Sequence, residues 1–256
     1  MALTFSRLGP NSILFDACAG VGPFAVPAAG TGALVIANDL NPDSFKWLKV
    51  NCEKVKKKKG LRVECHNMDA RDFIKSRVRE ELFKLWKSDL ETEQKDETVI
   101  SRDIHITMNL PALAITFLGV FQGLFKDFPD LKEVSSSLLP KVHVYGFSKA
   151  ENKATDIQGR CEKYLGQKLD SAHLEEVSFV RNVAPNKDML RASFLVPKTV
   201  MFDMDPVAPG DTVEDTEEEE GDVVLKSSKR DLSPDNLKTD SRKKVNNEPV
   251  WYGERF

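Results

Sequence analysis

The chain has 256 residues, of which 41% are hydrophobic and 30% charged, and its formal net charge is −3. This length allows one large domain or two small ones, and the slight acidity excludes a global basic field that would attract nucleic acid. The four cysteines and four histidines show no ligand-like spacing, so we expect no zinc site. The sequence also lacks a run of about 18 apolar residues and a secretory signal pattern, so we expect no membrane partner.

Apolar runs alternate with amphipathic segments along most of the chain. The predicted strands cover residues 12–19, 33–40, 61–65, 104–108, 142–147, 177–180 and 190–196. The predicted helices begin at residue 25 and then cover 42–59, 72–86, 112–125 and 154–165, with 87–102 as a polar surface loop. Strands that alternate with helices predict a parallel sheet with helices on both faces. The last two strands are joined by the turn-like residues 184–188, so we expect them to be antiparallel.

The charge pattern divides the chain into two parts. Residues 1–202 carry the strand and helix patterns and are expected to form one α/β domain. Residues 203–256 hold an acidic block at 214–222, short basic clusters and few apolar residues. This composition predicts a disordered, charged tail.

The segment from Asp16 to Phe24, Asp-Ala-Cys-Ala-Gly-Val-Gly-Pro-Phe, lies between the first strand and the first helix. Gly20 and Gly22 let the backbone turn sharply, and the helix beyond them offers free N–H groups. Such a turn binds nucleotide-like ligands in open α/β sheets. The spacing differs from the dinucleotide pattern Gly-x-Gly-x-x-Gly, and the acid Asp16 favours the cationic ligand S-adenosylmethionine. The alternative is an ordinary strand-to-helix turn.

Polar side chains follow the next three parallel strands of the predicted sheet. Asp39 follows the second strand, Asp69 the third and Asn109 the fourth, so together with Asp16 they line one crevice. A carboxylate at Asp39 can accept both hydroxyls of a ribose, and Asp69 can accept from an adenine amino group. The alternative for both acids is a helix N-cap, for Asp69 at a helix that begins at Asp72.

Asn109-Leu110-Pro111 is a second motif, after the fourth strand. The Asn109 amide can both accept from and donate to a base edge, and Pro111 is expected to begin the next helix. This pattern recurs in methyltransferases that modify a nitrogen, and the alternative is a simple strand-end turn. Phe45 and Trp47, near Asp39, are expected to pack rather than to stack on bases.

These motifs together resemble the archaeal and eukaryotic tRNA (guanine-37-N1)-methyltransferases. The resemblance covers residues 8–200 and includes Asn38-Asp39-Leu40-Asn41-Pro42, Tyr145-Gly146-Phe147-Ser148 and the segment from Val180 to Lys187. It implies a class I methyltransferase fold, with a Rossmann-like, seven-stranded, mostly parallel sheet and an antiparallel final strand. It also implies S-adenosylmethionine as the cofactor, tRNA as the partner and methylation of guanine N1 beside the anticodon.

The motifs and the resemblance together assign expected roles to particular residues. The expected cofactor-binding residues are Asp16, Gly20, Gly22, Asp39, Leu40, Asp69, Ala70 and Asn109. Asn109 is also the expected substrate-positioning residue, and the expected residues near the tRNA are Pro111, Arg181, Asn186 and Lys187. Other basic residues at 54, 56–59, 149 and 153 could contact phosphates, although lysines at 54–59 also suit a helix C-terminus.

The chain departs from this family at its N-terminus. Family members carry a region before the glycine turn that supplies tRNA recognition, a cofactor-contacting His and a Glu proposed as general base. Only eight residues, the last four of them Phe5-Ser6-Arg7-Leu8, precede Gly9-Pro10 here, so we expect an N-terminally truncated form with no identified base and little or no turnover on its own. The alternatives are a non-catalytic fragment that binds S-adenosylmethionine and tRNA, or a methyltransferase for another nitrogen. We expect a monomer in the cytoplasm, nucleus or mitochondrial matrix, where cysteines stay reduced.

Overall fold

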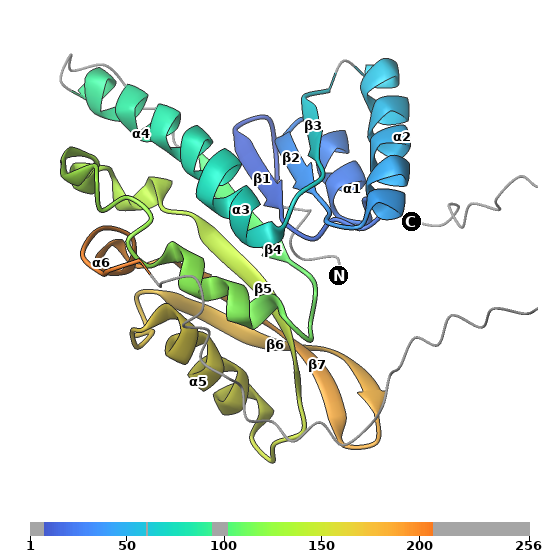
Figure 1. The fold of residues 1–256 in the computed structure, drawn as a ribbon, viewed down its shortest axis with the longest axis vertical. Coiled ribbons are helices and arrows are strands. Elements are labelled where there is room, and N and C mark those ends of the chain that lie inside the picture. The colour runs from blue at the N-terminus through green and yellow to red at the C-terminus, as the bar shows by residue number, and fades with distance from the viewer. Residues whose placement is uncertain (1–7, 60, 94–101, 207–256) are drawn as a thin grey trace, which may run out of the picture. The chain divides into compact units, whose positions relative to one another are not determined.

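The computed structural model describes residues 8–59, 61–93 and 102–206 of the chain (Figure 1). These residues form seven strands: β1 (Ser12–Asp16), β2 (Leu34–Asn38), β3 (Val63–His66), β4 (Asp103–Met108), β5 (Lys141–Ser148), β6 (Leu174–Ala184) and β7 (Lys187–Leu195). The α-helices are α1 (Ala25–Gly30), α2 (Pro42–Lys59), α3 (Ala70–Phe73), α4 (Arg79–Glu93), α5 (Lys153–Leu165) and α6 (Lys198–Phe202). A π-helical turn, η2 (Ile74–Val78), joins α3 to α4, and the 3₁₀ segments are η3 (Ala114–Phe121), η4 (Pro129–Glu133) and η5 (Ser136–Leu138).

All seven strands belong to one sheet with the order β3-β2-β1-β4-β5-β7-β6. The first five strands run parallel, and β7 is antiparallel to both of its neighbours, β5 and β6. The predicted α/β sheet with an antiparallel final strand is therefore confirmed. Of the predicted tail at 203–256, all but residues 203–206 lie outside the described part of the chain.

Side chains of the strands alternate between two apolar layers. Leu14 of β1 packs with α1 and α2 residues such as Leu48 on one face of the sheet, whereas its neighbour Phe15 faces the opposite layer. That second layer contains residues of α3, α4, η3 and α5, among them the fully buried Phe73 and Trp86. Figure 1 shows α1 and α2 beside the β1–β3 end of the sheet. Both faces of the parallel strands are buried, which explains their continuously apolar sequences.

The helix predicted at 72–86 is longer than its apolar pattern indicated. It begins at Ala70, because Asp69 is the N-cap, and it continues to Glu93 across most of the residues expected to form a loop. Asp89 is buried in this extension and Leu90 packs against the core. The predicted loop was therefore wrong for residues 87–93. Most side chains of this segment are polar, so its sequence shows little helical apolar pattern, but packing against the core stabilises a helix there. Residues 94–101 lie outside the described residues.

The α-helix predicted at 112–125 is also wrong. Residues 111–113 form a turn, and the 3₁₀ segment η3 follows from Ala114 to Phe121. Ile115, Thr116 and Val120 are β-branched and Gly119 is flexible, so α-helix propensity is low here despite the apolar composition. The segment is buried through Phe117 and its neighbours, so it serves the core without being a regular helix.

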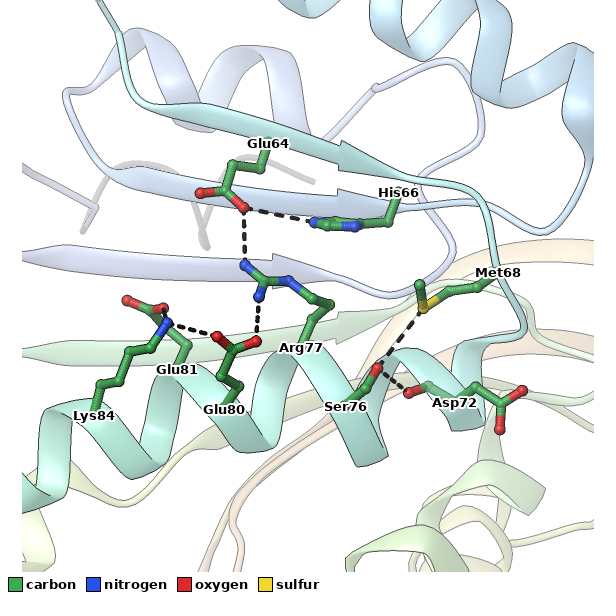
Figure 2. Close-up of polar contacts among 9 residues, drawn as sticks. All are labelled: Glu64, His66, Met68, Asp72, Ser76, Arg77, Glu80, Glu81 and Lys84. Carbon is green, nitrogen blue, oxygen red and sulfur yellow. Dashed lines mark hydrogen bonds and ion pairs between the residues drawn. The ribbon is translucent and has the colours of Figure 1, made fainter.

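Ion pairs connect β3 to the helix that follows it (Figure 2). Arg77 of η2 donates to Glu64 of β3 at 3.0 Å and also to Glu80 of α4. The same Glu64 oxygen lies 3.6 Å from Nε2 of His66, and burial together with Arg77 lowers the pKa of this histidine. These half-exposed pairs add little stability individually, and they link β3 to η2 and to the start of α4.

Candidate active site

The register of the sheet brings the predicted site residues to one edge. Asp16 pairs with Ala37 of β2 and with Thr107 of β4, so β1, β2 and β4 end at the same level. Because β7 is antiparallel, its first residues lie at this edge as well, with Asp188 opposite Ser148. The carboxyl edge of the parallel strands thus carries the glycine turn, the acids and Asn109, as the sequence predicted. It also carries the β6–β7 turn.

Asp39 holds the glycine turn in place. The backbone N–H of Gly20 donates to Oδ2 of Asp39 at 2.7 Å, and the N–H of Asn41 donates to Oδ1 at 3.0 Å. Asp39 is only partly buried, so its remaining lone pairs stay available to a ligand. Leu40 beside it is 64% exposed at the same edge. The ribose role stays a prediction, and the backbone contacts are a second role that the sequence did not reveal.

Asn38 is a site residue that sequence reasoning missed. It is fully buried, and its amide nitrogen donates to the carbonyls of Ala17 at 3.1 Å and Met68 at 2.9 Å. Its amide oxygen accepts from the N–H of Met68 at 3.1 Å. One side chain therefore joins the ends of β1, β2 and β3. A buried polar residue at the end of an apolar strand was the available signal.

Gly22 has no room for a side chain. Its φ is +99°, and a Cβ there would lie 2.9 Å from Cγ2 of Val26 and 3.1 Å from Cδ1 of Leu48. Gly20 also has a positive φ, of +57°, but no atom lies within 4 Å of the position of its Cβ. Gly22 is thus required by packing and conformation, whereas Gly20 is required by conformation alone.

We expect Gly22→Ala to lower the free energy of unfolding by about 1–3 kcal/mol more than Gly20→Ala. The difference arises because only the first substitution adds a steric contact to the backbone strain. Urea unfolding of the two variants, followed by circular dichroism, measures it. Equal losses would contradict the packing that we describe.

Asp69 caps the helix after β3, as its alternative interpretation predicted, although that helix begins at the buried Ala70 rather than at Asp72. Its Oδ1 accepts from the N–H of Arg71 at 2.7 Å, and Oδ2 lies 3.8 Å from Nη1 of Arg71. Arg71 also donates to the Thr116 hydroxyl at 3.3 Å and lies 4.3 Å from the ring centre of Phe117. Asp69 is thereby linked to η3, and its adenine role stays a prediction.

Asn109 follows β4 at the centre of the site edge and is half-buried. The next carbonyl, of Leu110, accepts from the N–H groups of Leu113 at 2.8 Å and Ala114 at 2.7 Å. Pro111 therefore opens a turn rather than an α-helix. Leu110 and Leu113 expose 40% and 51% of their surface, so they form an apolar rim beside Asn109.

The predicted tRNA-side residues of the β6–β7 hairpin are spread over its tip. Asn186 is exposed in the turn with a φ of +60°, and Nζ of Lys187 lies 4.6 Å from the ring centre of Phe147. Arg181 is exposed on β6, one of the two edge strands of the sheet. The rings of Phe24 and Tyr145 stack at 5.9 Å and connect the glycine turn to the hairpin side. The structure thus places Asn186 and Lys187 at the tip of the hairpin, with Arg181 further along β6.

Trp47 corrects one expectation. It is 51% exposed on α2, whereas Phe45 is half-buried, so the predicted packing fails for Trp47. Helix α2 instead packs against the core through Leu48 and Cys52. Lys54 and Lys56 are exposed in its later turns, where cations suit a helix C-terminus.

The described residues contain neither a membrane-spanning helix nor a cluster of metal-binding side chains. Within residues 8–59, 61–93 and 102–206, no helix has both the length and the apolar character that a membrane span requires. In the same ranges, no three His, Cys, Asp or Glu side chains gather in a way that could hold a metal ion.

Comparison with known proteins gives sequence relatives that share one name, tRNA (guanine(37)-N(1))-methyltransferase. The tRNA (guanine(37)-N(1))-methyltransferase of Xenopus tropicalis is 44% identical over 195 residues, which are 76% of this chain and 36% of the relative. The enzyme of the same name from Mus musculus is 45% identical over 195 residues, with the same two coverages. This chain is related to the tRNA (guanine(37)-N(1))-methyltransferases. The resemblance predicted from the motifs is therefore confirmed.

The chain spans about a third of the length of these methyltransferases, since it covers 36% of the Xenopus relative. No family model matches the chain. Among solved structures, wild-type Trm5b from Pyrococcus abyssi is 23% identical, with a TM-score of 0.48, covering 75% of this chain and 46% of that chain.

Proposed function

We propose that this chain takes part in methyl transfer from S-adenosylmethionine to N1 of guanine 37 in tRNA. The observation that carries the proposal is the identity of 44–45% to tRNA (guanine(37)-N(1))-methyltransferases, together with site residues that meet at one sheet edge. Action on tRNA as a monomer, in the cytoplasm, nucleus or mitochondrial matrix, belongs to the same proposal.

The residues present fit the cofactor. Both carboxylate oxygens of Asp16 are buried and have no hydrogen-bond partner among the described residues, which suits a cationic ligand. Gly20 leaves open space where a side chain would stand, so that a ligand can approach the backbone of the turn. When bound, S-adenosylmethionine supplies an activated methyl group on a positively charged sulfur.

The chain's own residues would bind the cofactor and orient the guanine base. Asp39 accepts from the ribose while it holds Gly20, and Asp69 accepts from the adenine amino group while it caps α3. Asn109 orients the base edge beside the apolar rim of Leu110 and Leu113. In-line positioning of this kind supplies a large part of the rate of a methyl transfer.

The guanine N1 proton must also leave, and two carboxylates at this edge of the sheet, Asp69 and Asp188, already have partners. Asp69 pairs with Arg71, while Asp188 accepts from Asn182 at 2.8 Å and lies 3.3 Å from Nζ of Lys153. Loss of a general base typically lowers a rate by about 10²- to 10⁴-fold. This observation favours a second candidate, a fragment that binds S-adenosylmethionine and tRNA without turnover.

A single-turnover assay separates the two candidates. The 256-residue chain in excess is incubated for hours with radiolabelled S-adenosylmethionine and tRNA transcripts that carry guanine or adenine at position 37. We expect slow labelling that requires guanine, because positioning persists while proton removal is poor. Labelling at the level of the adenine transcript would contradict methyl transfer by this chain and leave the binding fragment as the better account.

A further inference from the structure

Two of the four cysteines lie next to each other in the apolar layer between α2 and β3. The buried Cys52 of α2 belongs to the cluster on this side of the sheet, and Cys65 of β3 packs against the same cluster. Cys18 and Cys161 belong to the opposite apolar layer. The thiol groups of Cys52 and Cys65 form a hydrogen bond with each other, so their sulfur atoms are neighbours in the folded chain.

The alternation of side chains along β3 explains why Cys65 meets α2. Val63 is buried in the cluster that contains Cys52, and Cys65 follows two residues later on the same face of the strand. Glu64, between them, points to the opposite face, where it accepts from Arg77 of η2 (Figure 2). Helix α2 lies alongside β3, and Cys52 is on its buried side (Figure 1). The regular geometry of a strand and a helix therefore brings the two thiols together.

The two thiols differ in exposure and in their surroundings. Cys52 is 3% exposed, whereas Cys65 is half-buried, so a small solute reaches Cys65 first. The hydrogen bond from Cys52 lowers the pKa of the Cys65 thiol, and Lys49 and Lys56 of α2 act in the same direction, against burial and Glu53. The same hydrogen bond raises the pKa of Cys52. Because the thiolate is the nucleophilic form of cysteine, Cys65 is the attacking sulfur of the pair.

We propose that Cys65 and Cys52 are a reversible oxidation site for peroxides, at which a disulfide bond closes between β3 and α2. The Cys65 thiolate attacks one oxygen of the peroxide, the O–O bond breaks, and Cys65 becomes a sulfenic acid. The departing oxygen takes up a proton and leaves as water. The sulfur of Cys52 then attacks the sulfenic sulfur, the S–O bond breaks, and a second water leaves with the Cys52 proton. Two thiols and one hydrogen peroxide thus give one disulfide and two waters.

The pair has the features of a redox-responsive site rather than of a structural disulfide. Both cysteines are free thiols in the structure. Disulfides in reducing compartments are usually transient, and a small thiol such as glutathione reduces them again by exchange. Because Cys52 is adjacent, the sulfenic acid on Cys65 is converted into a disulfide before it is oxidised irreversibly to sulfinic acid. This chemistry involves neither S-adenosylmethionine nor tRNA, so it is independent of the proposed function.

Thiol counting on the folded chain tests the proposal. The reduced 256-residue chain is treated with hydrogen peroxide at pH 7, quenched over time with N-ethylmaleimide in urea, and weighed by mass spectrometry. We expect the four maleimide adducts of the reduced chain to fall to two, and dithiothreitol to restore all four. Peptide mapping should show Cys52 linked to Cys65 within one chain. The loss should be at least as fast as the oxidation of glutathione in a parallel reaction.

Three variants assign the roles of the two thiols. Cys52→Ala keeps a small apolar side chain in the core, so Cys65 should gain one and then two oxygen atoms without forming a disulfide. Cys65→Ala should leave Cys52 reduced. Cys18→Ala removes the other half-buried thiol and is the matched control, in which the bond should form as in the unsubstituted chain. Circular dichroism verifies that each variant is folded.

Peptide mapping of the unsubstituted chain decides the proposal even where a variant does not fold. A disulfide that includes Cys18 or Cys161, or one that joins two chains, would overturn it. Four thiols that persist after glutathione has been oxidised in the parallel reaction would do the same. Oxidation of Cys65 to sulfinic acid in the unsubstituted chain to the same extent as in Cys52→Ala would show that Cys52 does not act on it, and would also overturn the proposal.

Discussion

Replacement of Asp39 by alanine is expected to weaken S-adenosylmethionine binding by about 10- to 100-fold. Loss of a charged acceptor costs about 1.5–3 kcal/mol, and Asp39 is the predicted acceptor for both ribose hydroxyls. The structure adds a second cause, because the same carboxylate accepts from the N–H of Gly20 and positions the glycine turn. Calorimetric titration of the variant with S-adenosylmethionine measures the loss.

Two further variants separate these causes. Asp39→Asn keeps one acceptor oxygen for a backbone N–H and should lose less affinity than Asp39→Ala. Asp43→Ala removes an acid of equal charge from the exposed first turn of α2 and should bind normally. If Asp39→Ala binds S-adenosylmethionine as tightly as Asp43→Ala does, the ribose assignment is wrong.

Asn109→Ala is expected to slow methyl transfer by about 10²- to 10³-fold, the usual effect of removing one oriented hydrogen-bonding group from a reaction centre. Asn109 lies at the end of β4, next to the strand that leads into the glycine turn, and an apolar rim flanks it. Single-turnover labelling of a tRNA with guanine 37 reports the rate, and a parallel titration reports cofactor affinity. We expect the rate to fall much more than the affinity.

Asn11→Ala provides the matched control for that substitution. Asn11 is exposed immediately before β1, at the opposite edge of the sheet, so its loss should leave the rate unchanged. A rate for Asn109→Ala that equals the rate for Asn11→Ala would remove Asn109 from the reaction. A matching fall in affinity and rate would instead assign it to cofactor binding alone.

The position of the site could be predicted because it follows from regular patterns. Continuous apolar runs indicate buried parallel strands, and parallel strands bring their carboxyl ends to one edge. Asp16, Asp39, Asp69 and Asn109 therefore meet there, whatever the details of the loops. The antiparallel β6–β7 hairpin followed from its turn-like connection in the same way.

The connections within the site could not be predicted from such patterns. The Asn38 amide reaches carbonyls of residues that are 21 and 30 positions away, and the Asp39 carboxylate reaches a backbone N–H 19 positions away. These contacts depend on how strand ends align in space, which local periodicity does not encode. The 3₁₀ conformation of η3 could not be predicted either. Its apolar composition indicates burial but does not distinguish a 3₁₀ segment from an α-helix.

The reaction that we propose for this chain is methyl transfer to N1 of guanine 37 in tRNA. The most direct test is mass spectrometry of nucleosides from tRNA that was incubated with the 256-residue chain and S-adenosylmethionine, after nuclease digestion that isolates nucleotide 37. We expect 1-methylguanosine at this nucleotide, and about 10- to 100-fold less of it with the Asp39→Ala variant at a subsaturating concentration of S-adenosylmethionine. Methylation at another nucleotide or another nitrogen, or an unmodified guanine 37, would contradict it.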